Sequence, residues 1–221
     1  MGDTIKIRSI TQVTHDVKCF RTGKPPGFHF TSGQATDVAI NQPGYEDQVR
    51  PFTFTCLDDD NYLEFTIKRY KERHGVTDRL HQLQPGDELV IGDAWGAIEY
   101  KGPGYFIAGG AGITPFISIL RKLHKEKQLH GNTLFFSNKT AADIIYEQEI
   151  STMLGEQAVY LLTRETKPGY RSGHIDQQFI LENIHDFNRQ FYVCGPDKMV
   201  QDMVAALGEA GAATSALVFE K

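Results

Sequence analysis

The chain has 221 residues, which suffice for one large domain or two small ones. Its 23 Lys and Arg against 28 Asp and Glu give a formal net charge of −5, which argues against a protein that binds nucleic acid over a broad basic surface. A hydrophobic fraction of 40% with 11% aromatic residues argues against a disordered chain.

The first half of the chain contains short β-like runs separated by clusters of Gly, Pro and Asp. This spacing predicts a small antiparallel barrel or sandwich. One short helix is predicted over residues 77–83, with Thr77 as its N-cap residue. The predicted strands cover residues 5–13, 35–40, 51–56, 62–69, 88–92 and 97–100.

The second half alternates strands with helices, which predicts a parallel sheet covered by helices on both faces. A turn-rich linker over residues 100–104 separates the halves, so we expect one domain over residues 1–102 and another over 103–221. The predicted strands cover 104–108, 133–137, 158–163, 190–194 and 215–219, and the predicted helices cover 115–128, 144–154, 176–183 and 196–209.

A glycine-rich turn follows the first strand of the second half, and Pro115 then opens a helix. Glycines let a backbone approach a ligand closely, and the N-terminus of a helix attracts phosphate. The turn therefore favours phosphate binding, although its spacing differs from the Gly-x-Gly-x-x-Gly fingerprint. The alternative is a tight strand–helix turn without a ligand. The candidate binding residues of the turn are Gly110, Gly112, Ile113 and Thr114.

A second strand–turn–helix segment contains Cys194, Gly195 and Pro196. Ligands of open parallel sheets bind beyond the carboxyl ends of the strands, so these residues are expected on the same rim as the glycine-rich turn. The alternative is that Cys194 is a small buried residue that ends a strand.

In the first half, Arg50 leads an alternating strand through Pro51, Phe52 and Thr53. Arginine can clamp a phosphate with two parallel hydrogen bonds, and an aromatic ring can cover a planar ligand. The alternative is an ordinary amphipathic edge strand. Residues 75–77, downstream of Ile67 and Lys68, offer backbone N–H groups, a hydroxyl and basic charge for an anion, or else a simple helix cap.

Taken together, these motifs resemble those of the ferredoxin–NADP reductase family. The segment from Arg50 to Thr53 resembles its Arg-x-Tyr-Ser flavin signature, and residues 75–77 resemble its Gly-x-x-Ser/Thr segment. Residues 109–115 resemble its Gly-Gly-x-Gly-Ile-x-Pro loop, and residues 194–196 resemble its Cys-Gly-Pro segment. The match covers nearly the whole chain, with all motifs in order.

The resemblance implies an antiparallel β-barrel flavin domain followed by an α/β, Rossmann-like NAD(P) domain. It implies FAD, with FMN left open, and NADPH or NADH as the hydride donor. Arg50 would neutralise the flavin pyrophosphate. Phe52 stands where the family has Tyr, so its ring can stack but cannot hydrogen-bond the ribityl chain. Trp95 is expected to pack at the rim of the barrel, with a position near the flavin as the alternative.

Three residues are implied as catalytic: Thr53 near the flavin nitrogen that accepts hydride, Cys194 beside the nicotinamide, and Glu220 close to the reacting rings. The alternative for Glu220 is a solvated charge near the chain end. No metal ligand is predicted. The implied cofactor-binding residues are Arg50, Pro51, Phe52, Thr53, Ile67, Lys68, Gly75, Val76, Thr77, Gly110, Gly112, Ile113, Thr114, Thr163, Arg164, Arg171, Cys194, Gly195 and Pro196.

A preference for NADPH is implied by residues 163–165, which resemble the Ser-Arg-Glu segment that holds the 2′-phosphate in NADPH-using members. Arg171 and Lys139 add basic charge nearby. The alternative is that Arg164 only pairs with Glu165 or with solvent.

The implied function is that of an oxidoreductase, which moves electrons from NAD(P)H through FAD to a small carrier protein such as flavodoxin or ferredoxin. Such carriers are usually acidic, so a basic patch is expected. Alternatives are the reductase component of an oxygenase, a reductase of free flavin, or a non-catalytic flavoprotein module that senses redox state. The residues proposed for the patch, which could also be a solvated loop, are Lys68, Arg69, Lys71 and Arg73.

The chain is expected to be cytoplasmic. Its most apolar stretch, residues 105–120, is broken by glycines and a proline and is shorter than the ~20 apolar residues of a membrane span. The N-terminus lacks the apolar core of a signal peptide. Cys19, Cys56 and Cys194 are dispersed, which indicates a reducing compartment rather than a disulfide framework.

Overall fold

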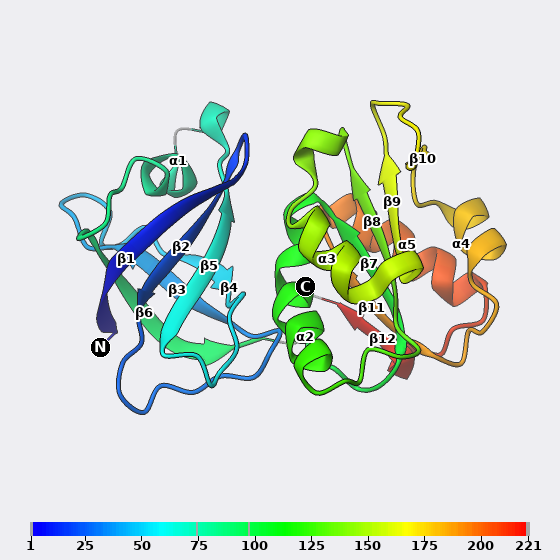
Figure 1. Cartoon of the computed structure of the whole chain (residues 1–221), viewed down its shortest axis with the longest axis horizontal. Coiled ribbons are helices and arrows are strands. Elements are labelled where there is room, and N and C mark those ends of the chain that lie inside the picture. Colours follow the sequence, from blue (N-terminus) through cyan, green and yellow to red (C-terminus); the bar gives the residue numbers. More distant parts are fainter. Residues whose placement is uncertain (1, 74, 97, 220–221) are drawn as a thin grey trace.

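The computed structural model describes residues 2–73, 75–96 and 98–219. Their strands form two six-stranded sheets, and each sheet takes all of its strands from one half of the chain. Figure 1 shows the two sheets side by side, with most of the helices gathered around the second sheet. The predicted class, an antiparallel barrel followed by a parallel α/β sheet, is confirmed.

The first sheet is antiparallel and has the strand order β4-β3-β6-β1-β2-β5. A bridge between Phe54 and Phe65 joins its two edges, because Phe54 directly follows β4 and Phe65 lies on β5. This bridge closes the sheet into a barrel. The elements are β1 (Asp3–Thr14), β2 (Val17–Gly23), β3 (Ala35–Ile40), β4 (Arg50–Thr53), β5 (Tyr62–Lys68), α1 (Val76–Leu80) and β6 (Glu88–Trp95).

The barrel core is aromatic and aliphatic. Phe20, Phe54 and Phe65 are fully buried in it, and Phe30 stacks on Phe54 with the ring centroids 4.2 Å apart. At one end of α1, His81 is buried, and its Nε2 lies 2.8 Å from the carbonyl oxygen of Ile67 on β5. These contacts hold the short helix against the barrel.

The second sheet is parallel throughout and has the order β10-β9-β8-β7-β11-β12. Every residue of its central strand β7 is buried, as expected of a strand covered on both faces. Its elements are β7 (Gly104–Gly109), α2 (Thr114–Lys125), β8 (Thr133–Asn138), α3 (Glu147–Leu154), β9 (Ala158–Leu162), β10 (Arg171–Ser172), α4 (Gln177–Asn183), β11 (Gln190–Cys194), α5 (Asp197–Glu209) and β12 (Leu217–Phe219).

Two hydrophobic cores cover the two faces of this sheet. Phe116 and Leu120 of α2 and Ile150 of α3 pack with one face, whereas Phe179 of α4 and Leu207 of α5 pack with the other. Residues 115–120 of α2 are all buried, so its first turns are enclosed on every side, whereas only Leu123 is buried in its last turns. The prediction of helices on both faces is therefore correct. Within the described ranges, no helix is long and apolar enough to cross a membrane.

Several local predictions are wrong. β2 and the short β10 were not predicted, and residues 98–100 are not a strand. Instead β6 extends to Trp95, because the end of β6 pairs with the start of β3 at Ala35. Trp95 is 42% exposed rather than packed at the rim.

Candidate functional site

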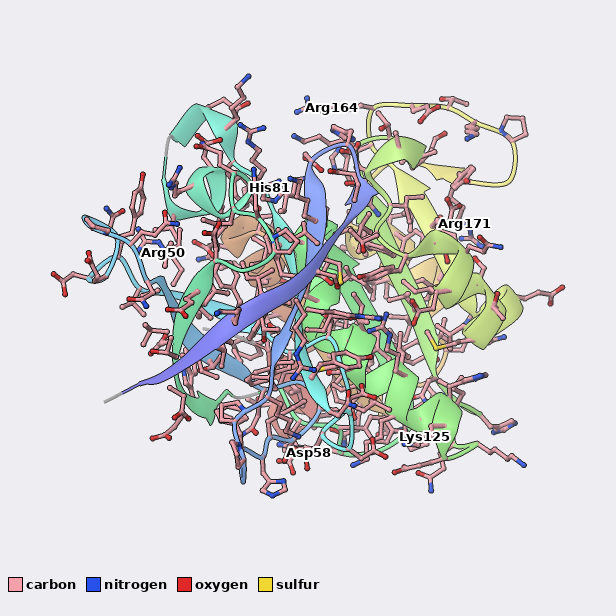
Figure 2. The ribbon with its side chains drawn as sticks, turned by 60° about the vertical axis from the view of Figure 1, so that its left-hand side comes forward. Arg50, Asp58, His81, Lys125, Arg164 and Arg171 are labelled. Atoms are coloured by element: carbon pink, nitrogen blue, oxygen red, sulfur yellow. The ribbon has the colours of Figure 1, made fainter. Side chains whose placement is uncertain are left out.

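The flavin side of the candidate site begins at Arg50, the first residue of β4. Its side chain is exposed at the edge of the first domain (Figure 2), and Nη1 donates to the carbonyl oxygen of Val49 at 2.7 Å. Within the described ranges, Arg50 forms no ion pair. A guanidinium has five N–H donors, so most of them remain available to a phosphate.

Helix α1 lies next to the loop that leads to Arg50. Arg79 of α1 donates to Gln42 Oε1 at 2.7 Å and covers the ring of Tyr45 at 5.8 Å. The predicted N-cap is wrong: the cap is Gly75, which has no side chain for capping, and Thr77 lies inside the helix. The Thr77 hydroxyl instead accepts a hydrogen bond from the N–H of Tyr70 at 3.3 Å.

The other predicted flavin residues differ in exposure. Pro51 is exposed, Thr53 is half-buried, and the half-buried Phe52 packs partly against the barrel core. Ile67 is 1% exposed, and its side chain packs in the barrel core. Lys68 is engaged in an ion pair with Asp16 at 2.9 Å.

The nicotinamide side is the glycine-rich turn after β7. A Cβ atom added to Gly112 would overlap with the carbonyl group of Cys194, and one added to Gly109 would lie 2.5 Å from the sulfur of Met199. The turn and the segment after β11 are therefore in backbone contact, which confirms that both lie on one rim. Ile113 is fully buried below them, and the Thr114 hydroxyl donates to Ala111 O at 3.0 Å.

The segment that follows β11 completes this rim. Cys194 is 7% exposed, and a Cβ atom added to Gly195 would lie 3.2 Å from Gly109 Cα. Pro196 precedes α5, the helix that carries Met199. Close backbone packing favours glycine here and holds the two segments together beyond the carboxyl ends of β7 and β11.

The predicted 2′-phosphate residues follow β9. Arg164 is exposed, and its backbone N–H donates to Lys139 O at 2.9 Å. The carboxylate of Glu165 accepts from the N–H of Ala141 at 2.7 Å, so it is engaged away from Arg164. Arg171 instead contacts α4, with its guanidinium 5.6 Å from the ring centroid of Phe179. Figure 2 shows Arg164 and Arg171 as separate cations on the second domain.

A cavity of about 580 Å³ lies beyond β10 and β11 and was not predicted. His174, Ile175 and Gln177 line one side of it, and Lys198 and Met199 line the other. The two sides are more than 20 residues apart in the sequence, so local patterns could not reveal the cavity.

The two halves meet along α2. The Ser118 hydroxyl accepts a hydrogen bond from the N–H of Gly33 at 3.0 Å, and the N–H of Phe54 donates to the neighbouring Gln34 at 3.1 Å. These contacts bring the end of the flavin strand next to the first turns of α2, and thus next to the glycine-rich turn. The predicted catalytic residue Glu220 lies outside the described residues.

Two of the four residues of the predicted basic patch are engaged in ion pairs. Lys68 pairs with Asp16, and Arg69 pairs with Asp78 at 2.7 Å. Lys71 is exposed, and the side chain of Arg73 lies outside the described part of the chain.

These features fit two dinucleotide cofactors. The exposed guanidinium of Arg50 beside α1 fits the pyrophosphate of FAD. The glycine-rich turn fits the pyrophosphate of a nicotinamide dinucleotide, because it lies beyond the carboxyl end of β7 and three of its residues, Gly109, Gly110 and Gly112, have no side chain between backbone and ligand.

Comparisons with known proteins agree with this division. Residues 4–100 match the family model of an oxidoreductase FAD-binding domain, and residues 106–205 match that of an oxidoreductase NAD-binding domain. The matches together cover most of the chain and assign one cofactor to each sheet.

Two curated relatives are similar over most of the chain. NADH-cytochrome b5 reductase 2 of Mycosarcoma maydis is 25% identical over 86% of this chain and 59% of its own length. The reductase component of propane 2-monooxygenase of Rhodococcus jostii is 26% identical over 98% of this chain and 62% of its own length. The chain thus spans about three fifths of the length of these relatives.

Solved structures share the fold. The flavohaem-like FAD/NAD-binding domain of nitric oxide dioxygenase from Vibrio cholerae matches with a TM-score of 0.88 and 21% identity, covering 99% of this chain and 98% of that one. A ferredoxin–NADP reductase from Neisseria gonorrhoeae, with bound FAD and NADP, matches with a TM-score of 0.84 and 20% identity, covering 99% and 97%.

Proposed function

Because the chain belongs to the ferredoxin reductase-like family of FAD- and NAD-binding oxidoreductases, we propose that it is a flavin-dependent oxidoreductase that passes electrons from NAD(P)H through FAD to a carrier protein. The carrier proposed from the sequence is a ferredoxin or flavodoxin. The domain boundary is proposed between residues 102 and 103.

One observation carries the proposal. The end of the strand that bears Thr53 lies against the first turns of α2, and α2 begins at the glycine-rich turn. A flavin held along β4 and a nicotinamide held at the turn would therefore approach each other at this junction. Bound together, the two cofactors supply hydride chemistry, and the protein supplies their orientation and electrostatics.

Each group of the site has a separate role in this proposal. Arg50 binds the flavin pyrophosphate, and the hydroxyl of Thr53 holds the flavin ring by a hydrogen bond. The glycine-rich turn before α2 cradles the nicotinamide pyrophosphate with its backbone. Cys194, at the end of β11, forms the floor beside the nicotinamide and excludes water from it.

The preferred donor is proposed to be NADPH, with Arg164 as the partner of the 2′-phosphate. The support for this proposal is that the side chain of Arg164 is exposed and that the carboxylate of Glu165 binds the N–H of Ala141 instead of Arg164. The cavity of about 580 Å³ between residues 174–177 and α5 is proposed to take the adenosine part of the donor, because it adjoins Met199 below the turn.

A second acceptor class has support of its own. The Rhodococcus jostii relative is the reductase component of a monooxygenase, and its similarity extends over 98% of this chain. An oxygenase partner is therefore the alternative to a ferredoxin or flavodoxin.

The test begins with the visible spectrum of the purified protein. A flavin absorption band is expected, which NADPH bleaches under anaerobic conditions more efficiently than NADH does. Reduced protein is then mixed with ferredoxin, flavodoxin, cytochrome b5 and free flavin, and acceptor reduction is followed at two ionic strengths.

The outcomes separate the alternatives. Rapid reduction of ferredoxin or flavodoxin supports the proposal. Turnover with free flavin alone indicates a free-flavin reductase, and flavin that NAD(P)H fails to reduce indicates a redox-sensing module. A protein that binds no flavin contradicts the proposal altogether.

A further inference from the structure

Arg121 of α2 reaches across the boundary between the two sheets. Its Nη1 donates to the carbonyl oxygen of Thr55 and to Glu64 Oε1, both at 2.6 Å. Its Nε and Nη2 donate to the two carboxylate oxygens of Glu149 on α3, at 2.5 and 2.9 Å. Tyr146 covers the guanidinium, with the ring centroid 5.2 Å away. One side chain therefore uses all three of its nitrogens to join two domains.

The partner in the first domain is a deeply buried carboxylate. The side chain of Glu64 is 1% exposed, and it also accepts from Arg21 Nε at 2.8 Å and from the Thr55 hydroxyl at 2.9 Å. Burial raises the pKa of Glu64, but the charge of Arg121 and the hydrogen bonds from Arg121, Arg21 and Thr55 together outweigh burial, so the pKa lies below its ordinary value of 4.5. Two arginines thus balance two glutamates in a neutral cluster.

A second contact from the same helix face lies beside the cluster. Ser118 and Arg121 are three residues apart, so they share one side of α2. Ser118 holds Gly33, and Arg121 holds Thr55. The N–H of Phe54 donates to the carbonyl oxygen of Gln34, which follows Gly33, and Thr55 follows Phe54. The contact at Gly33 therefore holds the backbone that pairs with Phe54, and the contact at Thr55 holds the end of the strand that carries Thr53.

Helix α2 connects these contacts to the nicotinamide side. The helix begins at Thr114, directly after the glycine-rich turn, and Arg121 lies seven residues later. At 1.5 Å per residue, this is about 10 Å along the helix axis. A rigid helix of this length therefore transmits the position of its contacts to the turn.

We propose that Arg121 is a positioning residue, which sets the distance between the flavin-binding strand and the nicotinamide-binding turn through its paired contacts with Thr55, Glu64 and Glu149. This inference rests on the proposed function. The competing explanation is that Arg121 only neutralises the buried charge of Glu64, in which case any cation would serve.

The variant Arg121→Lys separates the two explanations. A lysine keeps the positive charge beside Glu64, but a single ammonium lacks the planar fork that reaches Thr55 and both carboxylates together. The matched control is Arg21→Gln, because Arg21 also binds Glu64 but comes from β2 of the same barrel. Both variants are purified as full-length protein, with and without flavin.

Two measurements are made. The first is the rate of flavin reduction by NADPH in single-turnover experiments, together with the KM for NADPH. We expect Arg121→Lys to lower this rate by roughly ten- to hundredfold, as expected of a misplacement on the order of 1 Å, while KM stays within about twofold. Arg21→Gln is expected to change neither.

The second measurement is backbone hydrogen exchange in peptides that cover residues 33–35 and 53–56, in flavin-free protein. Arg121→Lys is expected to speed this exchange, and Arg21→Gln is not. This measurement does not depend on catalysis, so it remains informative even if the proposed function is wrong.

The proposal is overturned if Arg121→Lys reduces flavin at the parent rate, because charge alone would then suffice. It is also overturned if Arg21→Gln slows reduction equally, or if exchange is unchanged in both variants. A parent protein that NADPH does not reduce contradicts the proposed function instead, and the exchange data then decide whether Arg121 still fixes the strand.

Discussion

The two sides of the candidate site are built differently. On the nicotinamide side the backbone itself forms the surface, since Gly109 and Gly112 contact the segment after β11 without room for a side chain. On the flavin side the surface consists of side chains, and Arg50 and Pro51 are exposed. A backbone surface exists before the ligand arrives, whereas exposed side chains are ordered by the ligand. Substitutions on the two sides should therefore have different consequences.

The largest effect is expected for Gly112→Ala. The added methyl overlaps the carbonyl of Cys194, so the turn and the segment after β11 must separate. We expect a loss of about 3 kcal/mol of stability, typical of overpacking, and a loss of NADP⁺ binding. Denaturant unfolding and calorimetric titration with NADP⁺ measure the two effects.

Gly208→Ala on α5 is the control, because a Cβ there has no heavy atom within 4 Å. It should raise stability by about 0.5–1 kcal/mol through helix propensity. An equal stability and an equal NADP⁺ affinity of the two variants would show that the backbone contact at Gly112 is not tight.

The next largest effect is expected for Arg50→Ala on the flavin side. Loss of a charge-assisted phosphate contact costs about 1.5–3 kcal/mol, which is roughly ten- to hundredfold in flavin affinity. The stability of the flavin-free protein should stay within about 0.5 kcal/mol, because the side chain is exposed. Flavin fluorescence titration and unfolding of the apoprotein test this.

Arg8→Ala is the matched control, since Arg8 is an exposed arginine of the same barrel. If the Arg50 variant retains flavin as tightly as the Arg8 variant does, the flavin phosphate lies elsewhere.

A smaller and more selective effect is expected for Arg164→Ala. It should raise the KM for NADPH by roughly tenfold or more and leave the KM for NADH nearly unchanged, because only NADPH carries the 2′-phosphate. Steady-state kinetics with both donors measure this, with Lys167→Ala in the same loop as the control. Equal effects on both donors, or a parent enzyme that prefers NADH, would remove Arg164 from the 2′-phosphate site.

The smallest expected effect is that of pH on the folding stability of the first domain. Burial lowers the pKa of His81 below its ordinary value of 6.5, and the nearby charges of Lys18 and Arg69 lower it further. The unfolded chain therefore binds a proton at a higher pH than the folded chain does. The contribution of His81 to the folding stability of the protein is therefore complete above pH 6.5. It is lost as the pH falls from 6.5 through the folded-state pKa of His81.

Fluorescence can assign this pH effect to the barrel, because the single tryptophan, Trp95, lies on β6. Urea unfolding followed by tryptophan emission should show lower stability at pH 5.5 than at pH 7.5. The difference should shrink in His81→Gln. An unchanged difference in that variant would assign the effect to another group.

The sequence predicts the alternation of the second half well, because apolar runs of a parallel sheet are long and are separated by clear helices. Strand β11 agrees with the predicted strand, and helix α4 begins one residue after its predicted start at Asp176. The barrel is harder, since its strand ends depend on distant partners. β2 was missed although it pairs with both β1 and β5, and the end of β6 is set by Ala35 far along the chain.

In the candidate site too, local patterns could be predicted from the sequence, whereas contacts between distant residues could not. The glycine-rich turn and the segment at Cys194 could be predicted, because each is a local strand–turn–helix pattern. The cavity at His174 and the cluster of Arg121 with Glu64 could not, because their members lie on separate elements and carry no motif. The start of α1 was misplaced because Thr77 resembles a cap, although its hydroxyl bonds to Tyr70.

The separation of the two sheets has a consequence for how such proteins recombine. No strand of the described chain is shared between the sheets, so either half could in principle be exchanged for that of a relative without rebuilding a sheet. Glu64 restricts which exchanges succeed. Joined to a foreign helix without an arginine at the position of Arg121, its buried carboxylate would keep only Arg21 as a cationic partner, and the joined protein should be less stable. The buried carboxylate of Glu64 thus limits which nicotinamide domains can be joined to this flavin domain without a loss of stability.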